Sequence, residues 1–98
     1  MIEVRQTEQF QDWLAKLRDH VAAKAIRRRI ARVQIGLLGD AKAVGDGVHE
    51  LRIDHGPGYR VYFARRGQVV VLLLSGGIKA GQDRDIARAK ALAAEWTE

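Results

Sequence analysis

The chain has 98 residues, with 17 Lys or Arg against 12 Asp or Glu, so its formal net charge is +5 with histidine neutral. This length leaves room for one domain, residues 1–98, and excludes two. With 47% hydrophobic and 30% charged residues, the composition excludes a wholly disordered chain. A basic domain of this size favours a polyanion or an acidic protein as its partner.

Other absences narrow the class of protein. No cysteine is present, which excludes disulfides, thiolate-bound zinc and a cysteine nucleophile, and which suits a reducing cytoplasm. No apolar run approaches the roughly 18 residues of a membrane span. The N-terminus lacks the long apolar segment of a signal peptide. We therefore expect a cytoplasmic protein.

The first third of the chain predicts a strand and two helices. Residues 2–5 alternate apolar and polar side chains, as a short strand does. Thr7 is placed to cap a helix over about residues 8–18, and Asp19 is placed to cap a second one. Gly39 is a suitable end for the second helix, and the short connection favours an antiparallel helical hairpin. The apolar stripes of the two helices are Phe10, Trp13, Leu14 and Leu17, then Ile26, Ile30, Val33 and Leu37.

The second half predicts three strands and a final helix. The strands are residues 48–54, 59–63 and 68–75, separated by turns rich in glycine. The alternation slips at His49-Glu50, which allows a β-bulge there. The third strand has apolar side chains at both odd and even positions, so we expect other elements to pack on both of its faces, at least in part. Asp83 or Asp85 can cap the last helix. Its apolar stripe is Ile86, Ala89, Leu92, Ala93 and Trp96.

The element order β-α-α-β-β-β-α predicts an α+β fold. Its sheet is mainly antiparallel, because hairpin-length turns join the last three strands. The helical hairpin packs on one face of that sheet.

Basic side chains are concentrated on the second predicted helix. They form either a solvated outer face or a strip that contacts phosphates, and four arginines within six residues favour the second interpretation. The candidate RNA-binding residues here are Lys24, Arg27, Arg28, Arg29 and Arg32.

The strands place a second polar group on one face of the sheet. If Leu51, Ile53, Val61 and Phe63 face the helices, the residues between them face away. That face is either the wet side of an ordinary sheet or a site for phosphate chemistry, where cations stabilise a developing charge and a carboxylate or tyrosine moves a proton. The residues of this face are Glu50, Arg52, Asp54, Arg60 and Tyr62. Lys79 and Gln82 arrive beside it, and Gln82 is a further candidate for RNA binding.

No metal, nucleotide or hydrolase motif is present. The three histidines are scattered, and Gly56-Pro57-Gly58 lacks the spacing of a phosphate loop. We expect neither a metal nor a cofactor, and we keep His49 as a minor candidate base.

Three stretches of the chain are distinctive: Glu50–Asp54, Gly56-Pro57-Gly58-Tyr59-Arg60, and Ser75-Gly76-Gly77-Ile78-Lys79 followed by residues 82–89. They resemble the RelE/ParE superfamily of toxins from type II toxin–antitoxin modules, and within it the HigB-like addiction module killer proteins. The resemblance covers nearly the whole chain.

The resemblance implies a RelE-like fold and a partner antitoxin, usually with a helix-turn-helix DNA-binding domain, through which operator DNA is bound indirectly. In RelE-like members the activity is metal-independent cleavage of messenger RNA on the ribosome, in which the 2′-hydroxyl attacks the adjacent phosphate. By resemblance the phosphate-binding positions are Arg60 and Lys79. A Lys lacks the bidentate grip of an Arg on phosphate.

The chain departs from that pattern at the proton-transfer positions. Val48 and Glu50 stand where some relatives have lysines, and about Asp85 where they have a tyrosine. Candidate bases are therefore local: Glu50, Asp54, Asp83 and His49. Two alternatives stay open, a ParE-like DNA gyrase poison and a non-catalytic binding protein of the same fold.

Overall fold

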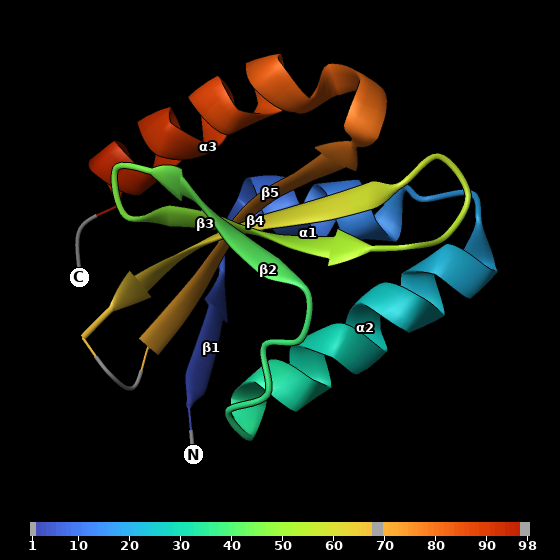
Figure 1. The fold of residues 1–98 in the computed structure, drawn as a ribbon, viewed down its shortest axis with the longest axis horizontal. Helices are drawn as coiled ribbons and strands as arrows, with labels where there is room; N and C mark the ends of the chain where they lie inside the picture. Colours follow the sequence, from blue (N-terminus) through green and yellow to red (C-terminus); the bar gives the residue numbers. More distant parts are fainter. Residues whose placement is uncertain (1, 68–69, 97–98) are drawn as a thin grey trace.

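The computed structural model describes residues 2–67 and 70–96, and its middle layer is a five-stranded sheet. Helices α1 and α2 pack on one face of the sheet and α3 on the other (Figure 1). None of the helices in this part of the chain is long and apolar enough to cross a membrane. The elements are β1 Glu3–Gln6, α1 Glu8–Ala15, α2 His20–Gln34, β2 Ala41–Gly45, β3 Val48–Ile53, β4 Tyr59–Arg66, β5 Val70–Ile78, a 3-10 turn Lys79–Gly81 and α3 Gln82–Glu95.

The strand order in the sheet is β1-β5-β4-β3-β2. Strand β1 runs parallel to β5, and the other neighbours are antiparallel. The predicted α+β class with a mainly antiparallel sheet is confirmed, and β2 is a strand that the sequence pattern did not reveal. Residues 68 and 69, which were predicted to open the long strand, lie outside the described residues.

The predicted caps of α1 and α2 are confirmed, whereas the predicted cap of α3 by Asp83 or Asp85 was wrong, because α3 begins after Gly81 with no side-chain cap and both acids lie in its first turn. Thr7 Oγ1 accepts a hydrogen bond from the Phe10 amide at 3.0 Å, and Asp19 Oδ1 accepts one from the Ala22 amide at 3.0 Å. Each cap satisfies an amide that the first turn of a helix leaves without a partner. These two side chains therefore set where α1 and α2 begin.

The end of α2 differs from the prediction. The helix stops at Gln34 because Gly36, with φ +89°, adopts the left-handed conformation that ends it. The Gly36 amide donates to the Val33 carbonyl and the Leu37 amide to the Arg32 carbonyl, each at 2.9 Å. Leu37 is therefore outside the helix and 51% exposed, and its predicted place in the apolar stripe was wrong.

The sheet is buried on both faces. Leu51, Ile53, Val61 and Phe63 pack toward α1 and α2, as predicted. On the opposite face, a second core formed with Ala89 and Ala93 of α3 contains Val48, Tyr62, Ala64, Leu72 and Leu74. The central strand β5 is accordingly covered on both sides, which confirms the prediction from its apolar run.

This two-sided burial also explains the slip at His49-Glu50. Strand β3 pairs with β4 in continuous register from Val48 to Ile53, so the predicted bulge in β3 was wrong. The irregularity lies in β2, between Ala43 and Gly45. Val48 and Leu51 are both apolar because each faces a different core.

Gly76 in β5 makes room for a ring. A methyl group added there would overlap the Trp13 indole, which packs on the strand from α1. We expect Gly76→Ala to lower the free energy of unfolding by about 1–3 kcal/mol, the usual cost of overpacking. Urea unfolding in the Trp13→Ala background provides the control. There the added methyl group should cost less, and an equal cost in both backgrounds would contradict this packing.

Candidate functional site

Two rows of side chains cross the sheet beneath the first turns of α3. The strand register places Glu50, Tyr62 and Ser75 in one row and Arg52, Arg60 and Gly77 in the next. The 3-10 turn brings the chain back over these rows, so that Gln82 reaches Glu50 and Asp85 lies against Gly77. Four predicted residues do share this face, namely Glu50, Arg52, Arg60 and Tyr62.

This face is not the open surface that the alternation suggested. Glu50 is 1% exposed and Tyr62 is 0% exposed. Both are covered because α3 packs on the same side of the sheet as their side chains. Their predicted place on an open face was wrong, since the strand pattern does not show where the last helix packs.

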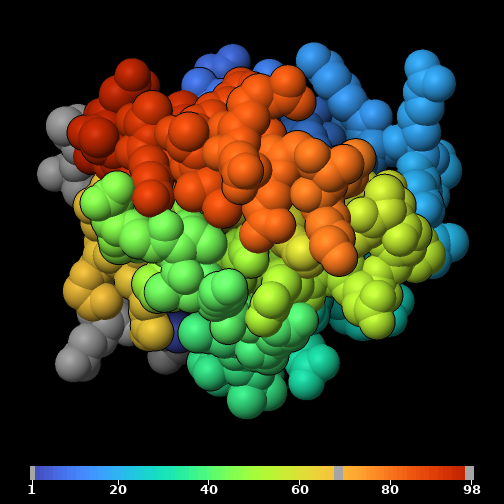
Figure 2. Space-filling view, turned by 45° about the horizontal axis from the view of Figure 1, so that its top comes forward, coloured from blue at the N-terminus to red at the C-terminus, as the bar shows by residue number. Residues whose placement is uncertain are grey.

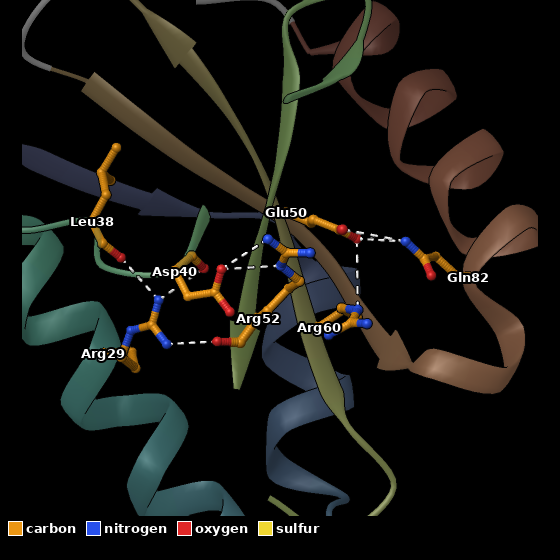
Figure 3. Close-up of polar contacts among 7 residues, drawn as sticks. All are labelled: Arg29, Leu38, Asp40, Glu50, Arg52, Arg60 and Gln82. Atoms are coloured by element: carbon orange, nitrogen blue, oxygen red, sulfur yellow. Dashed lines mark hydrogen bonds and ion pairs between the residues drawn. The ribbon is translucent and has the colours of Figure 1, made fainter. Parts of the chain in front are cut away.

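Glu50 is the centre of the polar contacts under α3 (Figure 3). The Gln82 Nε2 donates to its two carboxylate oxygens at 3.2 and 3.1 Å. The Arg60 Nε lies 3.7 Å from its Oε2. Burying a charge without partners costs free energy, and these contacts offset part of that cost for the Glu50 carboxylate. Glu50 thereby holds the Arg60 side chain in place.

Arg60 retains donors for a further acceptor. Its side chain is 11% exposed, and its Nε is buried without a hydrogen-bond partner. A guanidinium group carries five N–H donors and binds phosphate in a bidentate manner. Arg60 is therefore a pre-positioned cation at the floor of this face.

Tyr62 stays protonated at neutral pH. Burial raises its pKa to about 12, the charges of Glu50 and Asp85 add to that effect, and Arg60 opposes it. Its hydroxyl and that of Ser75, its cross-strand partner, are buried without hydrogen-bond partners. Tyr62 therefore does not serve as a base, and at 0% exposure it is buried too deeply for direct proton transfer to a substrate. Ser75 could not be recognised from the sequence as part of this group, because its place beside Tyr62 depends on the strand register.

A hollow of about 500 Å³ opens beside this buried group, at the start of α3 (Figure 2). Lys79 is exposed there, and its amide donates to the Gly58 carbonyl at 2.8 Å. Lys79 and Gln82 therefore meet as predicted, and Arg84 is an additional cation. The residues that line the hollow are Lys79, Ala80, Gly81, Gln82, Asp83 and Arg84.

Arg52 and Asp54 have different surroundings from those predicted. Arg52 shares the face of Glu50, but its Nε and Nη2 donate to Asp40 Oδ1 at 3.1 and 2.9 Å. Strand β3 ends at Ile53, so the alternation does not extend to Asp54. Asp54 borders a groove beside α2 instead, and its predicted place beside Glu50 was wrong.

Arg29 differs from the other basic residues of α2. Its guanidinium donates to the carbonyls of Arg52 at 2.6 Å, Leu38 at 2.9 Å and Asp40 at 3.2 Å (Figure 3). Burial lowers its pKa. Arg29 thus connects α2 to β3 and to the segment before β2. The remaining candidates of the strip are exposed: Lys24, Arg27, Arg28 and Arg32.

His49 lies on the opposite side of the sheet from Glu50. Its ring stacks on Phe63, with the ring centroids 5.2 Å apart, and Phe63 belongs to the core under α1 and α2. His49, a minor candidate base from the sequence, therefore does not lie beside the charged face. Within residues 2–67 and 70–96, no three His, Asp or Glu side chains come together as metal ligands.

Known proteins include one that is related to this chain in sequence and one solved structure that is similar in fold. No protein-family model matches the sequence. An uncharacterized protein of Haemophilus influenzae is 50% identical over 94 residues, which cover 96% of this chain and 95% of that protein. The chain belongs to the same family as this protein.

The fold is RelE-like. A structure of the E. coli toxin RelE, a double arginine-to-alanine mutant in the free state, matches with a TM-score of 0.71 and 16% sequence identity. The match covers 97% of this chain and 98% of that chain. At this identity the likeness establishes the fold, and the predicted RelE-like fold is confirmed.

The hydrogen bonds of Arg29 predict a difference in stability between neighbouring arginines. We expect Arg29→Ala to lower the free energy of unfolding by about 1–3 kcal/mol, because three carbonyls lose a charged donor. The matched control is Arg28→Ala, an exposed change expected to stay within about 0.5 kcal/mol. Urea unfolding measures both, and equal losses would contradict a structural role for Arg29.

The raised pKa of Tyr62 predicts a loss of stability in alkali. Unfolded, Tyr62 loses its proton near its usual pKa of 10.0, whereas the folded protein retains it to about 12. The stabilisation is thus fully present below pH 10 and is lost as the pH rises toward 12. In urea unfolding across this range, Tyr62→Phe should lose less stability than the wild type. If the stability of the wild type and of Tyr62→Phe fell in parallel with rising pH, Tyr62 would not be the group responsible for the loss.

Proposed function

We propose that this protein is the toxin of a type II toxin–antitoxin module, and that it arrests growth by cleaving messenger RNA on the ribosome. The RelE-like fold over the whole chain supports the toxin assignment. The observation that supports RNA cleavage most directly is a hollow at the start of α3 that is large enough for a phosphodiester and is lined by the cations Lys79 and Arg84. Arg60 is connected to this hollow through Glu50, which it contacts and which accepts a hydrogen bond from Gln82 in the lining.

The proposed reaction is an internal phosphoryl transfer. The 2′-hydroxyl attacks the adjacent phosphorus, a bond forms from the 2′-oxygen to phosphorus, and the bond from phosphorus to the 5′-oxygen breaks. One proton leaves the 2′-oxygen, and another is delivered to the departing 5′-oxygen. Arg60 and Lys79 would neutralise the charge that develops on the phosphate oxygens.

Asp83 is the proposed base, because it is the carboxylate that lines the hollow. Its exposure leaves it in reach of a substrate. Glu50 is too deeply buried for direct proton transfer and instead orients Arg60. This assigns different tasks to two of the predicted acids, and it leaves Asp54 and His49 outside the chemistry.

The partners follow from the same proposal. A cognate antitoxin, usually with a helix-turn-helix domain, would silence the toxin and would carry it to operator DNA. Exposed cations on α2 would add attraction to ribosomal RNA. Membership of the HigB-like branch is part of this proposal, and it rests on the Gly-Pro-Gly-Tyr-Arg and Ser-Gly-Gly-Ile-Lys stretches.

Poisoning of DNA gyrase is the second candidate function, and Glu50 is the observation that favours it. An acid 3.7 Å from the Arg60 Nε offsets part of the positive charge that phosphate cleavage needs. Under this alternative, Arg60 would have a structural role. A binding protein of the same fold is the third candidate.

Growth arrest and message cleavage distinguish these functions. We expect Lys79→Ala to lower the rate of message cleavage by about 10²-fold, as loss of a charge-stabilising donor does. Because Lys79 is exposed, the variant should fold as the wild type does, which thermal unfolding checks. Lys16→Ala, an exposed change at the end of α1, is the matched control and should retain full activity.

Arg60 provides the second part of the test. Arg60→Ala should abolish growth arrest, and Arg60→Lys should retain part of it while keeping a cation beside Glu50. Truncated messages during in-vitro translation would support the RNase. Intact messages together with cleaved DNA–gyrase complexes would replace it with the gyrase poison. Expression without growth arrest would leave the binding protein.

A further inference from the structure

The outer face of α2 carries a stripe of side chains that lies away from the hollow. Val21, Arg28, Arg32 and Ile35 follow one another at spacings of seven, four and three residues, so they lie on one side of the helix, with Lys24 beside them. The apolar side chains of the buried stripe, Ile26, Ile30 and Val33, lie on the other side. At about 1.5 Å per residue, the stripe is about 21 Å long.

Apolar side chains stand at both ends of this stripe. Val21 is 64% exposed and Ile35 is 63% exposed, and Leu37 just beyond is 51% exposed. In the described part of the chain, these are three of the four large hydrophobic residues that are exposed. Clustered exposed apolar groups are a feature of interaction surfaces, and here they flank three cations.

A groove of about 200 Å³ runs beside the stripe. It is smaller than the clefts of about 300–1,000 Å³ that small ligands occupy, so it has room for one side chain of a partner. One wall is held by Arg29, whose three carbonyl bonds fix it to β3 and to residues 38–40. The residues that line the groove are Ala25, Arg28, Arg29, Arg32, Ile53 and Asp54.

We propose that the outer face of α2 docks an acidic, amphipathic segment of a protein partner. Carboxylates of such a segment would pair with Lys24, Arg28 and Arg32, while its apolar side chains would cover Val21 and Ile35. A nucleic-acid backbone would use the cations but would leave the apolar ends uncovered. A second copy of this chain is a poor match, because it carries a net charge of +5 itself.

The docked segment would leave the hollow at the start of α3 open. Helices α2 and α3 lie on opposite faces of the sheet (Figure 1). This surface goes beyond the proposed function and does not depend on which macromolecule the toxin attacks.

Binding of two probes to the purified chain tests the proposal. The first probe is a synthetic helical peptide with one leucine stripe flanked by glutamates, and the second is oligouridylate RNA. A peptide of the same composition, with its leucines spread around the helix, is the control probe. Fluorescence anisotropy measures the affinity of each probe for the wild type and the variants.

Two double variants separate the apolar and the charged contributions. Val21→Ser with Ile35→Ser should lower the affinity for the amphipathic peptide about tenfold, which corresponds to about 1.4 kcal/mol of binding free energy. The same change should leave the affinity for RNA unchanged. Arg28→Ala with Arg32→Ala should lower the affinity for both the peptide and the RNA. The matched control is Lys42→Ala with Arg88→Ala, which removes the same charge from β2 and α3 and should affect the peptide less.

Two results would overturn the proposal. One is equal binding of the amphipathic and the spread-leucine peptide. The other is a combination of two observations: the apolar double variant binds the peptide as the wild type does, and the arginine double variant no longer binds RNA. That combination would identify α2 as an RNA contact. Growth arrest by the apolar double variant, Val21→Ser with Ile35→Ser, separates this question from the proposed function, because neither residue is a candidate RNA contact. Loss of peptide binding with arrest retained in that variant leaves the toxin assignment intact.

Discussion

Glu50 is buried beneath α3, and the arrangement of the candidate site depends on the partners that its carboxylate finds there. Gln82 approaches it from the first turn of the helix, and Arg60 approaches it from the neighbouring strand. Without them the acid would be buried with neither a counter-charge nor a hydrogen bond, at a cost comparable to the effect of a severe core mutation. The same contacts also hold the start of α3 over the sheet and fix the Arg60 side chain beside Glu50.

Burial of both sheet faces separates the polar residues into groups with different roles. Toward α1 and α2 the sheet is apolar, and Arg29 completes the polar contacts at its margin through backbone carbonyls. Toward α3 an apolar half under Ala89 and Ala93 adjoins a polar half under Gln82 and Asp85. The hollow forms where this polar half reaches the surface. Cations therefore gather at one end of α3, while the cationic stripe of α2 faces solvent on the other side of the molecule.

Much of the fold could be predicted from local patterns. Thr7 and Asp19 were recognisable as helix caps, because their side chains act within three residues of their own position. The alternation in β3 and β4 correctly placed Glu50, Arg60 and Tyr62 on one face. The end of α2 was missed because Gly36 comes before Gly39 and either glycine could end the helix. Strand β2 was missed because residues 41–45 carry little apolar periodicity.

The candidate site was predicted less completely than the fold. The sequence by itself determined the net charge, the helix starts, the parity of each strand and the residue types available for chemistry, because these depend on near neighbours. Only the tertiary structure decided that α3 covers Glu50 and Tyr62, that Arg29 binds carbonyls, and that Asp54 faces α2. These outcomes depend on contacts between residues far apart in the chain, and a burial cost that the whole fold must satisfy selects among them.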